Sequence, residues 1–181
     1  MPIKGLTDQT ASFPRIGELR KGAPKPEKGW GADLNYFRFT SEVPGVEMSF
    51  QQIYGEAPQA LDVYLPYATA DDNFECWIEE WKAGGLMWRG DGENMVIWRT
   101  PQGTYSQEIK PMPANHNGKQ VGRLKVILPK LGRMAYVVAL TSSVHDIMEL
   151  TANLRAYQAL RGSLQGIPFI LRRVPRTIST P

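Results

Sequence analysis

Short runs of alternating apolar and polar residues predict most of the regular structure of this chain. Residues 33–39 and 60–65 alternate in this way and are rich in aromatic and β-branched side chains, so each predicts a strand with one buried face. Five more apolar runs bounded by turn residues also predict strands: 86–89, 95–99, 123–128, 134–140 and 167–171. Residues 47–54 fit either a strand or a short helical turn.

Helical spacing appears first between Phe74 and Trp81, where apolar residues stand at i, i+3, i+4 and i+7. Thr69 or Asp71 can cap the start of such a helix, and the glycine pair at 84–85 can end it. The pattern therefore predicts an amphipathic helix over residues 74–81.

A second helix is predicted after the serine pair at 142–143, either of which can cap it. Apolar side chains from Val144 to Leu160 roughly share one face, and Gly162 or Gly166 ends the helix. Two helices placed among these strands indicate an α+β fold, with a mixed or mainly antiparallel sheet packed by two principal helices.

Residues 1–33 are predicted to form an N-terminal arm in front of a single α+β domain at 34–181. Prolines alternate with glycines from Pro14 to Gly31, and both residue types disfavour regular structure. The arm is locally basic at Arg20, Lys21 and Lys25. A flexible arm of this kind could reach a partner and become ordered on it, whereas an ordered arm would need a surface to lie on.

The distribution of charge singles out the C-terminal end. The net charge of the 181 residues is only +3, but the last acidic residue is Glu149. Five arginines follow it: Arg155, Arg161, Arg172, Arg173 and Arg176. This asymmetry indicates either a polyanionic or acidic partner, or a solvated helix face followed by a loose basic tail.

Residues that could perform catalysis are few. Ser142, Ser143, His145 and Asp146 supply the residue types of nucleophilic catalysis, but serine and aspartate at a helix start are explained by capping. The sequence has no motif for a metal, and none for nucleotide phosphates, so we expect no cofactor. We expect a protein that is not an enzyme. An enzyme with an unrecognised hydrolytic site remains as an alternative.

The single cysteine, Cys76, excludes an internal disulfide and is expected to be a small, buried or half-buried side chain in the first predicted helix. The N-terminus lacks the apolar core of a signal peptide, and no apolar run is long enough to span a bilayer. The expectation is a soluble, cytoplasmic protein without a membrane partner.

Aromatic and basic residues interleave in the predicted strands and loops. The aromatic residues are Trp30, Tyr36, Trp88, Trp98 and Tyr105, and the basic residues are Arg38, Arg89, Arg99, Arg123 and Lys125. Such combinations bind single-stranded nucleic acid by stacking and phosphate contacts, and they also form hot spots of protein interfaces. The alternative, which we favour, is that most of the aromatic residues belong to the core.

Four blocks of the sequence, taken in order, resemble one phage family. They are FPRIGELRKGAPKPEKGWGADLNYFRF, YGEAPQALDVYLPYATADDNFECWIEEWKAGGLMWRGDGE, GRLKVILPKLGRMAYVVALTSSVHDIMEL and LRGSLQGIPFILRR. Together they span nearly the whole chain and are similar to the recombination directionality factor-like proteins, which are accessory factors of large serine integrases.

The resemblance implies a non-catalytic protein that binds a DNA-bound large serine integrase near its mobile coiled-coil arm. By binding one assembly more tightly, such a factor favours the synapsis that leads to excision. Members of the family carry cysteines where this chain has residues 90–118, but only His116 is available here, so no metal is expected. Relatives also continue beyond the ISTP block, so this chain is expected to be a short or trimmed member.

The expected contacts with the integrase, and with DNA if it is touched directly, lie in the two basic segments. The candidate residues are Arg20, Lys21, Lys25, Arg172, Arg173 and Arg176. Charge reversal at the last three is expected to weaken partner binding and to leave the fold intact. The alternative function is a single-stranded nucleic-acid-binding protein of phage replication or recombination.

Overall fold

The computed structural model describes residues 12–174 except residues 28 and 30, so the candidate Arg176 lies outside the described residues. The elements are β1 (Arg15–Gly22), β2 (Asp33–Thr40), α1 (Val46–Tyr54), β3 (Ala60–Tyr64), α2 (Ala70–Asn73), β4 (Phe74–Lys82), β5 (Gly85–Gly90), β6 (Asn94–Arg99), β7 (Tyr105–Ser106), β8 (Lys110–Pro111), β9 (Lys119–Val126), the 3-10 turn η1 (Pro129–Leu131), β10 (Tyr136–Thr141), α3 (Val144–Arg161) and β11 (Pro168–Arg172).

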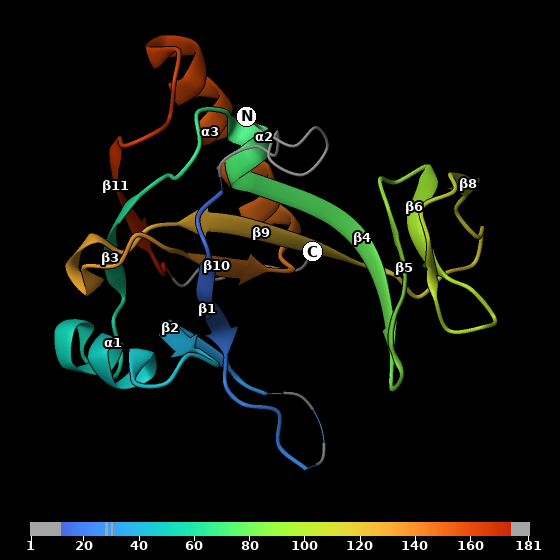
Figure 1. Cartoon of the computed structure of the whole chain (residues 1–181), viewed down its shortest axis with the longest axis horizontal. Coiled ribbons are helices and arrows are strands. Elements are labelled where there is room, and N and C mark those ends of the chain that lie inside the picture. Colours follow the sequence, from blue (N-terminus) through green and yellow to red (C-terminus); the bar gives the residue numbers. More distant parts are fainter. Residues whose placement is uncertain (1–11, 28, 30, 175–181) are drawn as a thin grey trace, which may run out of the picture.

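A single large sheet organises the molecule (Figure 1). Over the described residues it has nine strands in the order β2-β1-β10-β9-β4-β5-β6-β7, and β8 also pairs with β6. All its pairs are antiparallel except β1 with β10. A small second sheet joins β11 to β3. The predicted α+β class with a mixed, mainly antiparallel sheet is confirmed.

The core lies against one face of the large sheet, which we call the inner face. Leu19 of β1, Leu124 of β9 and Val137 of β10 point to it and are almost fully buried. Phe50 of α1 and Leu154 of α3 belong to the same cluster, as do side chains of β3 and β11. The helices and the small sheet therefore cover the inner face, and the side chains that alternate with this set point to the opposite, outer face.

Strand β1 lies inside the predicted arm, so the expectation that residues 1–33 avoid regular structure is wrong for residues 15–22. The prolines at 14, 24 and 26 flank this strand and remove no ladder donor from it. Gly17 serves close packing, because an added Cβ would lie 2.5 Å from the ring of Phe39 on β2. β1 is thus a strand of the sheet interior, between β2 and β10.

The predicted helix over residues 74–81 is also wrong, because these residues form β4. β4 pairs with β5 on one side and β9 on the other. Thr69 is an N-cap as predicted, but the helix it caps is the single turn α2, and Gly85 (φ 109°) belongs to the hairpin that follows β4. Cys76 consequently lies on a strand and is exposed rather than buried.

The second predicted helix is confirmed as α3, capped by Ser143 and ended at Gly162. The ambiguous segment at 47–54 is the helix α1. Three α-helices occur in the described part of the chain, and two principal helices at the predicted places are therefore not confirmed. Figure 1 shows β5, β6 and β8 set apart from the helices, at the end of the long, curved β4.

Candidate partner-binding site

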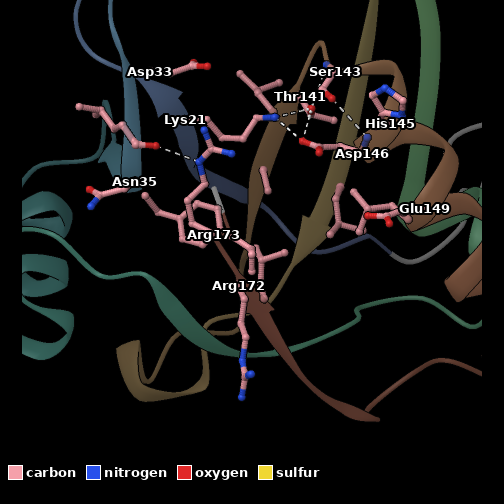
Figure 2. A pocket seen from close by; sticks show the side chains of 18 of the residues that line it. Lys21, Asp33, Asn35, Thr141, Ser143, His145, Asp146, Glu149, Arg172 and Arg173 are labelled. Carbon is pink, nitrogen blue, oxygen red and sulfur yellow. Dashed lines mark hydrogen bonds and ion pairs between the residues drawn. The ribbon is translucent and has the colours of Figure 1, made fainter. Parts of the chain in front are cut away.

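A groove of about 780 Å³ opens on the inner face of the sheet. Its walls come from β1, β2, β10, the first turns of α3 and the residues around the end of β11. Its lining includes apolar side chains such as Phe37, Leu124 and Leu150. Charged side chains, among them Lys21, Asp146 and Arg173, also line it (Figure 2). An apolar hollow with a few placed polar groups is typical of a binding site.

Lys21 of β1 is tied to the start of α3. Its Nζ donates to Oγ1 of Thr141 at 2.7 Å and forms an ion pair with Asp146. The Thr141 hydroxyl donates to Oδ2 of Asp146 at 3.0 Å, so the three side chains form one connected group in the groove (Figure 2). Lys21 therefore anchors β1 to α3 and already has an acidic partner within the chain.

The carboxyl group of Asp146 is held in its charged form. Burial alone would raise its pKa, but the hydrogen bonds from Lys21 and Thr141 and the positive charges of Lys21 and Arg173 act the other way. The net result is a pKa below the ordinary value of 3.8.

The structure brings Arg172 and Arg173 to the same groove as Lys21. Arg173 is held in place, since its Nε donates to the carbonyl oxygen of Leu34 at 2.9 Å and its backbone N–H donates to that of Gln59 at 2.8 Å. Arg172 is exposed, and Figure 2 shows its side chain pointing away from Lys21. Of the two, Arg172 is the one that is available for a partner.

The remaining described candidates lie elsewhere. Arg20 precedes Lys21 on β1 and so points to the outer face, where it is ion-paired with Glu18. Lys25 lies beyond the end of β1 and is exposed. The structure thus divides five of the six candidates between the groove, the outer face and a loop, and the sixth, Arg176, lies outside the described residues.

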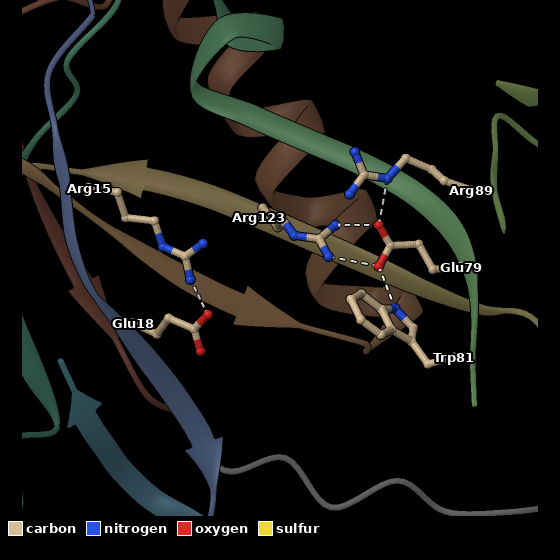
Figure 3. A network of polar contacts seen from close by, with 6 residues as sticks. All are labelled: Arg15, Glu18, Glu79, Trp81, Arg89 and Arg123. Carbon is tan, nitrogen blue, oxygen red and sulfur yellow. Dashed lines mark hydrogen bonds and ion pairs between the residues drawn. The ribbon is translucent and has the colours of Figure 1, made fainter. Parts of the chain in front are cut away.

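Charge patterning alone gave no sign of a second polar cluster, which lies on the outer face around Glu79 (Figure 3). This side chain is completely buried, and it accepts two hydrogen bonds from Arg123, at 2.9 and 2.7 Å. Nε of Arg89 donates to it at 2.7 Å, and Nε1 of Trp81 donates at 2.9 Å. The cluster joins β4, β5 and β9 at the point where β5 leads into the outlying strands.

Burial raises the pKa of Glu79, but the hydrogen bonds from Arg123 and Trp81 and the charges of Arg123 and Arg89 outweigh it. The pKa of this carboxyl group therefore lies below its ordinary value of 4.5. A carboxylate with two guanidinium partners and an indole is satisfied, as a buried charge has to be.

The other cations of the predicted stacking surface also have acceptors within the chain. Lys125 pairs with Glu75, Arg38 donates to the carbonyl oxygen of Gly22, and Arg99 donates to that of Gly84. Among the aromatic residues of that surface, Trp88 is buried and Tyr105 is 53% exposed, while Trp30 lies outside the described residues.

Two of the residues considered for catalysis, Ser143 and Asp146, have structural roles. The Ser143 hydroxyl accepts from the backbone N–H of Asp146 at 3.3 Å, which is the capping interaction predicted from the sequence. The Asp146 carboxylate is occupied by Lys21 and Thr141. His116 packs edge-on against Trp88, with ring centroids 5.2 Å apart.

Two absences hold for the described residues only. They contain no group of three or more His, Cys, Asp or Glu side chains placed to hold a metal ion. None of their helices is long and apolar enough to cross a membrane.

Comparison with protein families gives one finding. A family model described as Gp3-like, recombination directionality factor-like, matches residues 16–181. The match begins at the second residue of β1 and includes the groove and the outer-face cluster. Comparisons with curated proteins and with solved structures give no match.

Proposed function

Because the chain belongs to the Gp3-like, recombination directionality factor-like family, we propose that it binds a large serine integrase on DNA and switches it from integration to excision. The family match over residues 16–181 is the observation that carries this proposal. In it the chain performs no chemistry, and the integrase cuts and joins the DNA.

The switch works by differential binding. A factor that binds the excision-competent integrase–DNA assembly more tightly than the integration-competent one shifts the population towards excision. Reversing an equilibrium from 1:99 to 99:1 needs a preference of about 10⁴-fold, or about 5.5 kcal/mol. An exposed ion pair contributes about 0–1 kcal/mol, so a partner contact through Arg172 is too weak by itself for a complete switch.

The groove supports a role in binding. It combines apolar lining residues with Arg172, and it lies at the junction of α3 with strands of the sheet. A partner segment in this groove would contact both the N-terminal strand β1 and the end of β11. The two basic segments singled out by the sequence would then both border the partner, with Arg172 as the cation available to it.

The alternative function, binding of single-stranded nucleic acid, has less support. Stacking surfaces need cations that are free to contact phosphates. Here Arg89 and Arg123 are committed to the buried Glu79, and Lys125 is committed to Glu75. Their contribution to a phosphate-binding surface is therefore small.

The test is recombination in vitro with purified chain and the integrase encoded in the same genome. We expect the chain to activate recombination between the hybrid sites that flank an integrated phage and to inhibit recombination between the phage and host sites. Direct binding of the chain to the integrase–DNA complex is measured in parallel.

The Arg172→Glu variant tests the surface under the same conditions, because Arg172 is exposed. We expect weaker binding and weaker activation from this variant. A wild-type chain that changes neither reaction and does not bind the integrase would refute the proposed function.

A further inference from the structure

Three side chains are each held by a hydrogen bond to the end of β4 or to the hairpin that follows it. Trp81 is 58% exposed although its Nε1 donates to Glu79 at 2.9 Å. Tyr105 is 53% exposed, and its hydroxyl donates to the carbonyl oxygen of Leu86 at 3.2 Å. Arg99 donates from Nη1 to the carbonyl oxygen of Gly84 at 2.7 Å. We call these three residues the hairpin cluster.

Each member of the hairpin cluster is fixed before any partner arrives. The three acceptors belong to β4 and the hairpin that follows it, so one short segment orients all three side chains. Ordering a mobile side chain at an interface costs about 0.5–1.5 kcal/mol, and a side chain that is already held avoids much of this cost. Tryptophan, tyrosine and arginine are the residue types most enriched among interface hot spots.

The buried Glu79 holds one member of the cluster, Trp81, in place. Arg89 and Arg123 fix its carboxylate from two neighbouring strands, and the carboxylate in turn fixes the indole of Trp81 (Figure 3). Burying the charge of Glu79 carries a desolvation penalty that its three side-chain partners have to offset. One role that explains this buried charge is to hold the exposed indole of Trp81 in a single orientation.

The charge around the hairpin cluster fits a protein partner better than a nucleic acid. Residues 81–118 carry four basic and three acidic side chains, which is close to neutral. The basic residues are Lys82, Arg89, Arg99 and Lys110, and the acidic residues are Asp91, Glu93 and Glu108. Nucleic-acid surfaces are strongly positive, because neutralising phosphates supplies most of their affinity.

We infer that Trp81, Arg99 and Tyr105 form a docking surface for a protein that offers an apolar hollow to the indole and a carboxylate to Arg99. The inference rests on the proposed function and takes the integrase as that protein. These anchors would supply part of the preference that the switch requires. Glu79 acts as a positioning residue through Trp81.

The experiment measures Kd for the integrase encoded in the same genome, on its DNA sites, with the full chain. We expect Trp81→Ala to weaken binding by at least about 30-fold, as for a hot-spot residue, and Tyr105→Ala by about 5- to 10-fold. Ile109→Ala is the matched control, because this side chain is 70% exposed in the same outlying region. It is expected to leave Kd unchanged.

A double-mutant cycle tests the positioning role. Glu79→Gln should weaken binding in the wild-type background and have no further effect in the Trp81→Ala background. Glu75→Gln is its control on the same strand, since Glu75 pairs with Lys125 and does not contact the indole. Equal effects of Glu79→Gln in both backgrounds would show that it acts on the fold and not through Trp81.

Three outcomes would overturn the inference. If wild-type chain binds the integrase and Trp81→Ala and Tyr105→Ala bind within about threefold of it, the surface is wrong and the proposed function stands. If wild-type chain does not bind the integrase, the proposed function fails and takes the inference with it. If Trp81→Ala instead abolishes salt-sensitive binding to a short single-stranded oligonucleotide without integrase, the surface is one for nucleic acid.

Discussion

The carboxylates of Glu79 and Asp146 both join elements that are distant in sequence, Glu79 joining β4 to β9 and Asp146 joining α3 to β1, but their surroundings differ. Glu79 on the outer face has no exposed surface and accepts four hydrogen bonds from Arg89, Arg123 and Trp81. Asp146 in the groove has a side chain that is 37% exposed, and its cationic partner is Lys21.

The difference in burial indicates that the Glu79 cluster is rigid and that the contacts around Asp146 can adjust. A buried charge that loses a partner stays unpaired, so the surroundings of Glu79 permit a single arrangement. At Asp146 water can replace a lost partner, so the groove can change its contacts at small cost. The hairpin cluster is therefore suited to act as a fixed anchor, and the groove is suited to adapt to the shape of its occupant.

The largest effect is expected from Glu79→Ala. It removes the carboxylate that Arg89 and Arg123 share and leaves two half-buried guanidinium groups without it. We expect a loss of about 3–4 kcal/mol in the free energy of unfolding, measured by urea denaturation. Glu75→Ala on the same strand should cost about 0.5 kcal/mol, and equal losses at both positions would contradict the contrast drawn here.

A smaller effect is expected from Asp146→Ala. The change removes the partner of Lys21 and a carboxylate in the first turn of α3, where it interacts favourably with the helix dipole. The expected loss is about 1–2 kcal/mol by the same measurement. A loss larger than that of Glu79→Ala would reverse the comparison.

Acid should weaken both networks. Since each folded-state pKa lies below its ordinary value, the stabilisation is fully present above about pH 4.5 for Glu79 and about pH 3.8 for Asp146. It is lost as the pH falls further, through the folded-state pKa of each group. Glu79→Gln and Asp146→Asn should each flatten the fall of stability between about pH 5 and pH 2. Curves parallel to that of the wild type would show that these carboxylates do not drive the acid response.

The smallest effect on stability is expected from Arg172→Glu. Its side chain is exposed, so the free energy of unfolding should change by less than about 0.5 kcal/mol. Arg173→Glu should cost about 1–2 kcal/mol, because it removes the hydrogen bond to Leu34. The expectation that charge reversal in this segment leaves the fold intact is thereby narrowed to Arg172.

Elements with local signals were predicted well from the sequence. The apolar runs at 86–89 and 95–99 correspond to β5 and β6, and the serine cap marks the start of α3. The order of apolar and polar residues at 74–81, in β4, fits both an amphipathic helix and an alternating strand. The strand form is favoured by contacts with neighbouring strands. With β4 extended, the Glu79 carboxylate forms ion pairs with Arg89 of β5 and Arg123 of β9. No pattern within residues 74–81 contains that information.

The candidate site was predicted in part. Net charge drew attention to Lys21, Arg172 and Arg173, and the fold brings these three residues to one groove. Charge counting could not show that Lys21 is neutralised by Asp146, or that Arg20 points to the other face. The sequence pattern placed Trp81 on the apolar face of a predicted helix, so its exposure beside a hairpin could not be predicted. The contact roles of all these residues stay predictions until binding is measured.

The position of β1 has a consequence for how the chain folds during synthesis. β1 lies between β2 and β10, and its register with β10 joins Leu19 to Ala139. The ribosome adds about 5–20 residues per second, so β1 waits roughly 6–24 s before its second neighbour exists. Until then one edge of the β1–β2 hairpin can pair with other chains. Slow folding and a need for chaperones early in translation are the expected results of this topology.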